Sequence, residues 1–383
     1  MSINFLIFVK YFSLFGNLSL ASGTLLWHIP RVVSERKTTL KDVARLAKVS
    51  TATVSRVASG NPQVDPEIQS AVHAAAKKLG IDLTDTRKNR TIAFLLGNRD
   101  TVNEFQSHIL LGAEGYCAQH NWDLQFISFR CDLYAPPANL LLPEALTRSN
   151  RVSGVILSGT HSVSILSALR ERRIPFSVVG NNIVGEWRPE EFDCVSTDDV
   201  RGAAEMTQHL ISQGHRDIWF IGNQRLPWFA RCAEGYSRTM KEAGLEPHFS
   251  EIRSEDRELG YLAIKSLLAS GERPTGIFAG TDEVASGVYQ ALQESGILIP
   301  DDISVVGFND TLGELLHPGL TTAREFPKEL GSHLAEFTLR RIREPNLPPQ
   351  QLTVPTELVR RESVRRITPA TISSKAPVHA NVS

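Results

Sequence analysis

The sequence predicts a small three-helix domain followed by a large α/β body with two lobes. A chain of 383 residues exceeds twice the size of a typical domain, so two or three folding units are expected. Apolar residues recur at helical spacing over residues 38–80, whereas short apolar strands alternate with helix-length segments from residue 91 onward. That alternation is typical of parallel sheets with helices on both faces, and it runs too far for one compact sheet.

The three predicted helices lie within residues 37–81. Thr39 and Ser50 are good N-cap residues for the first two helices, and Asp65 followed by Pro66 begins the third. The inward positions are apolar residues at helical spacing: Leu40, Val43, Ala44 and Ala47; Val54, Val57 and Ala58; Ile68, Ala71, Val72, Ala75 and Leu79.

The predicted strands of the body are short apolar runs: Thr91–Leu96, Asp123–Ile127, Gly154–Ser158, Phe176–Gly180, Asp217–Gly222, Gly276–Ala279 and Ile303–Gly307. We expect a first lobe of residues 91–192 with about 308–327, and a second lobe of about 193–307 with 328–366. The polar, Pro- and Ala-rich residues 367–383 are expected to form a disordered tail.

Residues 1–36 do not match either pattern. The stretch from Tyr11 to Pro30 is uncharged and long enough to span a bilayer, but it contains many polar residues and glycines. Lys10 interrupts the apolar run, although Ala21 and the two residues after it resemble a signal cleavage site. We interpret this extension as a disordered or misassigned start, with a weak membrane anchor and a secretory signal as the alternatives.

The overall net charge of −1 conceals an uneven distribution. Residues 37–90 carry a net charge of +5 and residues 1–36 carry +2, whereas residues 91–383 carry −8. A short basic region before a long acidic body indicates a polyanion-binding module attached to a soluble domain.

The cysteines and the catalytic motifs exclude several classes of protein. Four cysteines lie far apart without a C-x-x-C pair or a histidine cluster, so neither a disulfide framework nor a metal site is predicted. A reducing, cytoplasmic compartment fits this usage best. Hydrolase, metalloprotease, P-loop and dinucleotide signatures do not occur, so we predict neither catalysis nor a cofactor.

The second predicted helix has the surface that a reader of the DNA major groove needs. Close approach to the base edges requires short exposed side chains, which Thr51, Ala52 and Ser55 supply, and a long donor, which Arg56 supplies. A small helical subdomain with a merely solvated face is the alternative.

Residues 39–57, from Thr39-Leu40-Lys41 to Ser55-Arg56-Val57, closely resemble the headpiece of the lactose/galactose repressor (LacI/GalR) family of transcriptional regulators. Segments that resemble landmarks of that family follow in order through the body, so the resemblance covers about residues 38–366. It implies a helix-turn-helix headpiece, and a body like a type I periplasmic sugar-binding protein with a small effector between its lobes.

The resemblance implies specific contacts for the second helix. Thr51, Ala52 and Arg56 would contact bases, and the neighbouring hydroxyls would hold phosphates; these belong to Ser50, Thr53 and Ser55. The connector of residues 82–90 is shorter than usual and lacks the Ala-Arg-x-Leu motif of a hinge helix, which argues against a leucine lever in the minor groove.

Four residues are candidates for effector binding. Asp282 matches the family's ligand-binding aspartate, and Phe105 matches an aromatic residue that lines family pockets. Asn181 follows a predicted strand, where α/β sheets place their ligands. Arg231 lies one position from the family's ligand-gripping arginine, where this chain has Cys232, so its role is open. Helix capping for Asp282, loop capping for Asn181 and core packing for Phe105 are the structural alternatives.

Together these features predict a transcriptional regulator, with repression the favoured mode, that acts as a homodimer on a near-palindromic operator and responds to a sugar-like effector. An extracytoplasmic sugar-binding protein of a transporter is the main alternative, and a membrane-tethered regulator is a third.

Overall fold

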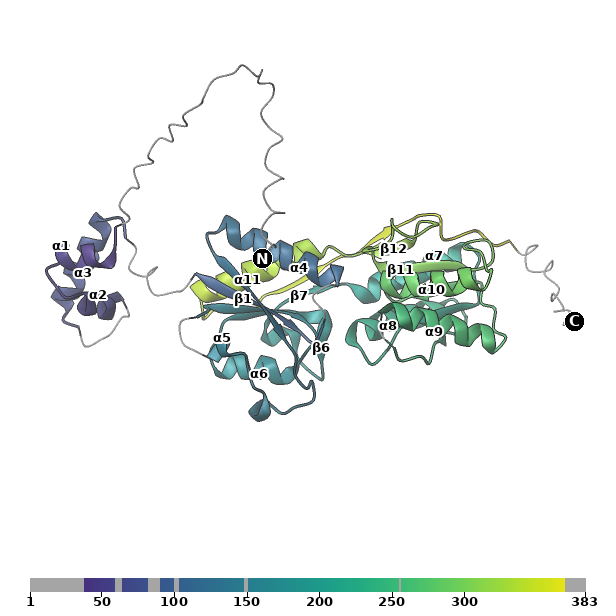
Figure 1. The fold of residues 1–383 in the computed structure, drawn as a ribbon, viewed down its shortest axis with the longest axis horizontal. Coiled ribbons are helices and arrows are strands. Elements are labelled where there is room, and N and C mark those ends of the chain that lie inside the picture. The colour runs from purple at the N-terminus through teal and green to yellow at the C-terminus, as the bar shows by residue number, and fades with distance from the viewer. Residues whose placement is uncertain are drawn as a thin grey trace, which may run out of the picture. The chain divides into compact units, whose positions relative to one another are not determined.

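The computed structural model describes residues 38–58, 64–81, 90–99, 103–147, 151–254 and 256–368 (Figure 1). They belong to two compact units, Met1–Arg87 and Lys88–Ser383. The expected extension of residues 1–36, nearly all of the connector and residues 369–383 lie outside the described residues. Among the described helices, none combines the length and apolar character needed to cross a membrane.

The first unit is a cluster of three helices: α1 (Leu40–Leu46), α2 (Thr51–Ala58) and α3 (Pro66–Lys78). Its small core is built from the side chains of Val43, Ala44, Val54, Val57, Ala58, Val72, Ala75 and Ala76. The inward positions of the first two helices are therefore as predicted. In α3 the expected face was wrong at two positions, because Ile68 and Ala71 are exposed while Ala76 is buried.

The body contains two six-stranded sheets. The first sheet, in spatial order, is β13 (Gln351–Val354), β7 (Asp193–Thr197), β5 (Phe176–Val179), β3 (Gly154–Gly159), β1 (Thr91–Gly97) and β2 (Asp123–Phe129), all parallel. The second is β14 (Glu357–Val359), β12 (Thr321–Arg324), β11 (Ser304–Asn309), β10 (Gly276–Ala279), β8 (Ile218–Ile221) and β9 (His248–Phe249), parallel except for β14. A two-stranded ladder joins β4 (His161–Ser162) to β6 (Ile183–Val184).

Helices cover both sheets. With the first sheet are α4 (Glu104–Gln119), α5 (Glu144–Thr147), α6 (Val163–Glu171) and α11 (Pro327–Arg343). With the second are α7 (Asp199–Ser212), α8 (Pro227–Glu242), α9 (Asp256–Ala269) and α10 (Asp282–Glu294). Short 3-10 turns are η2 (Pro137–Asn139), η3 (Gly180–Asn182) and η4 (Pro189–Glu191).

The strand β1 shows why the apolar runs predicted buried parallel strands. Its side chains alternate between the two faces of the sheet, so Phe94 packs with α4 and α11 while Leu95 packs on the α6 side. A strand covered by helices on both faces must be apolar at nearly every position. All seven predicted strands are present, with ends shifted by one or two residues.

The predicted division of the body into lobes was wrong at its crossovers. The chain passes between the lobes after β7, after β12 and after β13, so residues 193–197 and 327–354 belong to the first lobe. The strand β12 pairs with β11 and β14 of the second lobe, although we expected it in the first. Arg341 of α11 donates to Asp193 of β7 at 2.8 and 2.9 Å, which fixes that helix on the first sheet.

The body also continues slightly further than expected. Ile367 is buried, and its N–H donates to the carbonyl oxygen of Gln213 at 2.7 Å. The expectation of a disordered tail from residue 367 was therefore wrong at its first position.

A glycine allows α4 and α11 to approach closely. A Cβ atom on Gly112 would lie 1.9 Å from the carbonyl oxygen of Lys328, whereas one on Gly115 of the same helix would meet nothing within 4 Å. We expect Gly112→Ala to lower the free energy of unfolding by about 1–3 kcal/mol, because the helix backbones must separate.

Gly115→Ala is the matched control, and it should raise stability by up to about 1 kcal/mol through helix propensity. Urea denaturation followed by circular dichroism measures both changes. Equal effects of the two substitutions would contradict this account of the packing.

Candidate functional site

The outer face of α2 is composed of small and polar side chains. Ser50, Thr51, Ala52, Ser55 and Arg56 are exposed, so these predicted DNA-contact residues all lie on the surface of the three-helix unit. Val54 lies among them in the sequence, Val57 follows Arg56, and both valines point into the core. This alternation follows from the helical repeat, which gives one apolar and one polar face.

The sixth predicted contact residue, Thr53, is partly buried and takes part in the cap of α2. Its N–H donates to the hydroxyl of Ser50 at 3.0 Å, and the two hydroxyl oxygens lie 2.8 Å apart. Ser50 thus fixes the start of the helix, as its N-cap position predicted.

The turn before α2 has a left-handed residue. Lys48 has a φ of 56°, a conformation that disfavours a residue with a Cβ atom by roughly 1 kcal/mol. In the preceding helix, Asp42 accepts hydrogen bonds from the N–H and the hydroxyl of Thr39 at 2.9 and 2.8 Å. The first two helices are therefore held in place by a capped start, a tight turn and a second cap.

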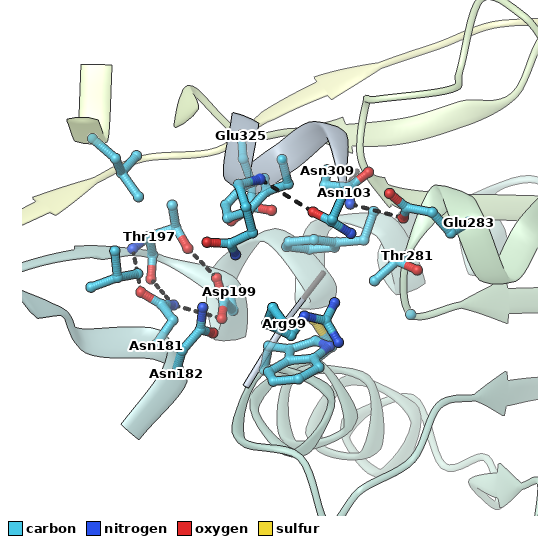
Figure 2. Close-up of a pocket in the computed structure, with 18 residues that line it drawn as sticks. Arg99, Asn103, Asn181, Asn182, Thr197, Asp199, Thr281, Glu283, Asn309 and Glu325 are labelled. Carbon is cyan, nitrogen blue, oxygen red and sulfur yellow. Dashed lines mark hydrogen bonds between the residues drawn. The ribbon is translucent and has the colours of Figure 1, made fainter. Parts of the chain in front are cut away.

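The body contains a pocket at the carboxyl ends of its parallel strands (Figure 2). About 590 Å³ of space lies between its protein atoms, a figure that includes the solvent at its opening. The first lobe contributes Arg99, Asn103, Phe105, Gln106, Val179, Asn181, Asn182 and Leu330. The lining also includes Thr197 at the end of β7, Asp199 at the start of α7 and Glu325 on the crossover between β12 and α11. The second lobe further contributes Trp228, Cys232, Gly280, Thr281, Glu283, Phe308 and Asn309.

A buried hydrogen-bond network lies where the first crossover leaves β7. The side chain of Asn181 accepts from the N–H of Thr197 at 2.8 Å and donates to its carbonyl oxygen at 3.0 Å and to Asp199 at 2.6 Å. The hydroxyl of Thr197 also donates to Asp199. Arg231 of α8 donates to Asp199 at 3.1 Å and to the carbonyl oxygen of Asn181.

The remaining charged side chains of the pocket come from other elements. Glu283 of α10 accepts from the side-chain amide of Asn309 at 3.2 Å. Burial, followed by the nearby charge of Asp199, raises the pKa of Glu325 well above its usual range. The guanidinium of Arg99 lies 4.7 Å from the ring centre of Trp228.

Two of the four predicted effector residues line the pocket. Phe105 and Asn181 both face it, but Asn181 uses its amide in the network at the crossover. Arg231 is not a lining residue; instead it holds two groups, Asp199 and the backbone of Asn181, from behind.

Asp282, the fourth predicted effector residue, lies outside the lining of the pocket. This carboxylate is fully buried, and it accepts hydrogen bonds from the hydroxyl of Thr322 at 2.7 Å and the N–H of Leu312 at 3.1 Å. It joins α10 to β12, and it does not line the pocket. The next residue, Glu283, lines the pocket instead, because consecutive side chains of a helix point about 100° apart.

Cys232 occupies the pocket wall at the position where the family resemblance implied an arginine. It is buried, and burial raises the pKa of its thiol well above the usual value, so it is a neutral lining group and not a nucleophile. Within the described ranges, no cluster of three or more His, Cys, Asp or Glu side chains is placed to hold a metal ion.

Sequence reasoning missed several lining residues for an identifiable reason. Asn309 comes two residues after the predicted strand Ile303–Gly307, so the rule that selected Asn181 could have found it. Thr197 and Asp199 lie at or just after the end of β7, and Glu325 follows β12; both strands are short and rich in polar residues, so no apolar run marked them.

The buried carboxyl of Asp282 should make stability depend on pH. Burial raises its pKa to about 7 from 3.8, so the folded state retains its proton to a higher pH than the unfolded state. The resulting stabilisation is complete below about pH 4 and is lost as the pH rises through about 7. Relative to Asp282→Asn, the wild-type protein should therefore lose stability between pH 5 and pH 8.

Urea denaturation of both proteins at several pH values measures this difference. Parallel stability curves for the two proteins would show that Asp282 does not titrate in this range.

Comparison with known proteins shows the family. Residues 39–81 match the model described as bacterial regulatory proteins, lacI family, and residues 207–364 match the periplasmic binding protein-like domain. The ribose operon repressor of Haemophilus influenzae is 32% identical over 338 residues, which cover 85% of this chain and 98% of the repressor.

Two solved structures have similar folds. A complex of the transcriptional regulator CelR with cellobiose has a TM-score of 0.64 and 28% identity, covering 85% of this chain and all of that one. A LacI family transcriptional regulator from Enterococcus faecium with bound ribose has a TM-score of 0.62 and 27% identity, covering 73% of this chain and all of that one. The chain belongs to the lacI family of bacterial regulatory proteins, and it is a DNA-binding transcriptional regulator rather than the sugar-binding protein of a transporter.

Proposed function

We propose that this regulator binds a small polyhydroxylated effector in the pocket of its body and that the effector controls its affinity for operator DNA. The observation that supports this most is the lining of the pocket, where amide and carboxylate groups surround aromatic rings. Amides and carboxylates bind hydroxyl groups, and an aromatic ring packs on the C–H face of a sugar. The ribose and cellobiose bound to two similar regulators have this chemistry.

In this proposal Phe105, Trp228 and Phe308 supply the apolar contacts, and Asn103, Asn182 and Asn309 supply hydrogen bonds to hydroxyl groups. Asn181 and Arg231 position the site by holding Asp199 and the crossover. We do not assign effector contact to Asp282, whose two oxygens already accept hydrogen bonds within the second lobe.

On the DNA side, the exposed face of α2 enters the major groove of a half-site. Arg56 and Thr51 contact base edges, Ala52 offers a methyl contact, and the hydroxyls of Ser50, Thr53 and Ser55 hold phosphates. A homodimer places two such helices on a near-palindromic operator. Since effector and operator bind the same molecule, each must change the affinity of the other by the same factor.

Arg56→Ala should strongly weaken sequence-specific DNA binding. Loss of a bidentate base contact costs about 1–3 kcal/mol per half-site, or roughly 10- to 100-fold in affinity. DNA fragments selected by the wild-type protein supply the probe, and fluorescence anisotropy measures binding of the two proteins. Lys77→Ala, at the far end of α3, is the control and should leave the specificity ratio intact. Unchanged affinity of the Arg56 variant would exclude α2 as the reading helix.

Phe105→Ala should weaken effector binding by about tenfold or more, because a buried aromatic contact worth roughly 1–2 kcal/mol is lost. Calorimetry of the full chain with D-ribose, cellobiose and other neutral sugars identifies a ligand and then compares the variants. Phe126→Ala removes a phenylalanine that is 41% exposed on β2 and outside the pocket, so it should bind normally. Equal affinities of the two variants would place the effector elsewhere.

A further inference from the structure

The lining of the pocket has an excess of negative charge. Three carboxylates line it, those of Asp199, Glu283 and Glu325, against one guanidinium, that of Arg99 (Figure 2). A second cation, Arg231, lies behind the wall and donates to Asp199 and to a backbone carbonyl. Arg99 stacks on Trp228 and lies 3.7 Å from Asp256. The two cations are thus already engaged by groups other than Glu283 and Glu325.

The acidic side chains occupy positions that a bound molecule would contact. Glu325 lies on the crossover between β12 and α11, and Asp199 is the first residue of α7, just after the crossover from β7. Glu283 is the second residue of α10 on the second lobe, with an amide hydrogen bond from Asn309 at 3.2 Å. The three acidic side chains therefore come from two of the three crossover regions and from the second lobe, and they line the same pocket.

Glu325 is the carboxyl group with the least compensation. The charged groups around it are Asp199, Glu283 and Arg231, with the Cys232 thiol nearby, and the hydroxyl proton of Thr197 is donated to Asp199. Desolvation, together with the two negative charges among these three, raises the pKa of Glu325 well above its usual range. A partly buried carboxyl in such surroundings keeps its proton unless a cation takes its place.

We propose that the natural effector carries a protonated amine, as an amino sugar or polyhydroxylated amine does, and that its ammonium group pairs with the carboxylate of Glu325. This inference rests on the proposed function of the pocket and adds the charge of the ligand. An ammonium group gains a charge-assisted hydrogen bond there once Glu325 ionises, and its positive charge offsets the repulsion that the ionised Glu325 meets from its acidic neighbours. A neutral sugar gains neither, and a sugar phosphate or sugar acid meets repulsion from the carboxylates of Asp199 and Glu283.

Binding should also displace a proton. The carboxyl proton of Glu325 is released to solvent when the ammonium group arrives, and no covalent bond is made or broken. The released proton is an independent signature, because a ligand held only by its hydroxyl groups leaves the carboxyl protonated.

Calorimetry of the full-length protein tests the proposal with matched pairs of ligands: D-glucose with D-glucosamine, D-galactose with D-galactosamine, and neutral 1,5-anhydroglucitol with cationic 1-deoxynojirimycin. Glucose 6-phosphate is the anionic probe. At pH 7 we expect the amine to bind about tenfold more tightly than its neutral partner in at least one pair. Titrations in two buffers with different ionisation enthalpies should show proton release for that amine only.

Glu325→Gln keeps the shape of the protonated side chain and should abolish both the preference for the amine and the proton release. Glu190→Gln, an exposed substitution outside the pocket, is the control and should retain both. Thermal denaturation checks that each variant is folded, and the comparison of ligands on the wild-type protein does not depend on the variants.

The outcomes separate the two proposals. If a neutral or anionic sugar binds and no amine binds more tightly than its partner, the inference is overturned and the proposed sugar site stands. If neither sugars nor amines bind, both the inference and the proposed effector chemistry fail. An amine preference that persists in Glu325→Gln would overturn the assignment of the ammonium to this residue.

Discussion

The carboxylate of Asp199 links the two lobes of the body through its hydrogen bonds. It is almost completely buried, and a buried charge is stable only when its oxygens are fully hydrogen-bonded. Its partners come from both lobes: Asn181 and the last residue of β7, Thr197, from the first lobe, and Arg231 from the second lobe. One residue thus fixes the end of β7, the start of α7 and the facing wall of α8.

The pocket depends on this arrangement because its polar groups come from segments that are remote in the sequence. Parallel strands of both sheets end at the cleft, and two of the three crossovers pass beside it. A ligand held there touches both lobes and the segments that join them, which are the segments whose geometry must change when the lobes move. An effector in this pocket is therefore well placed to select one arrangement of the body over another.

The three-helix unit is stabilised mainly by local interactions at its helix ends. Its core is built mainly from valine and alanine, so most of its ordering comes from local devices: two caps, a left-handed turn and a third cap by Asp65. Local devices suffice for a small unit because they restrict the helix ends directly. The outer face of α2 is left free of bulky side chains, as close approach to base edges requires.

The sequence alone determined the helices of the first unit, the seven apolar strands and the exposed polar face of α2, because each depends on neighbouring residues: a cap, a helical period or an apolar run. It also pointed to Phe105 and Asn181 as residues of the cleft. The tertiary structure decided to which lobe β12 and α11 belong. It also decided that the side chain of Glu283 faces the pocket while that of Asp282 faces β12. Those outcomes depend on which distant surface a segment packs against. Neighbouring residues of a helix point about 100° apart, so a shift of one residue decides whether a side chain faces the pocket or the core.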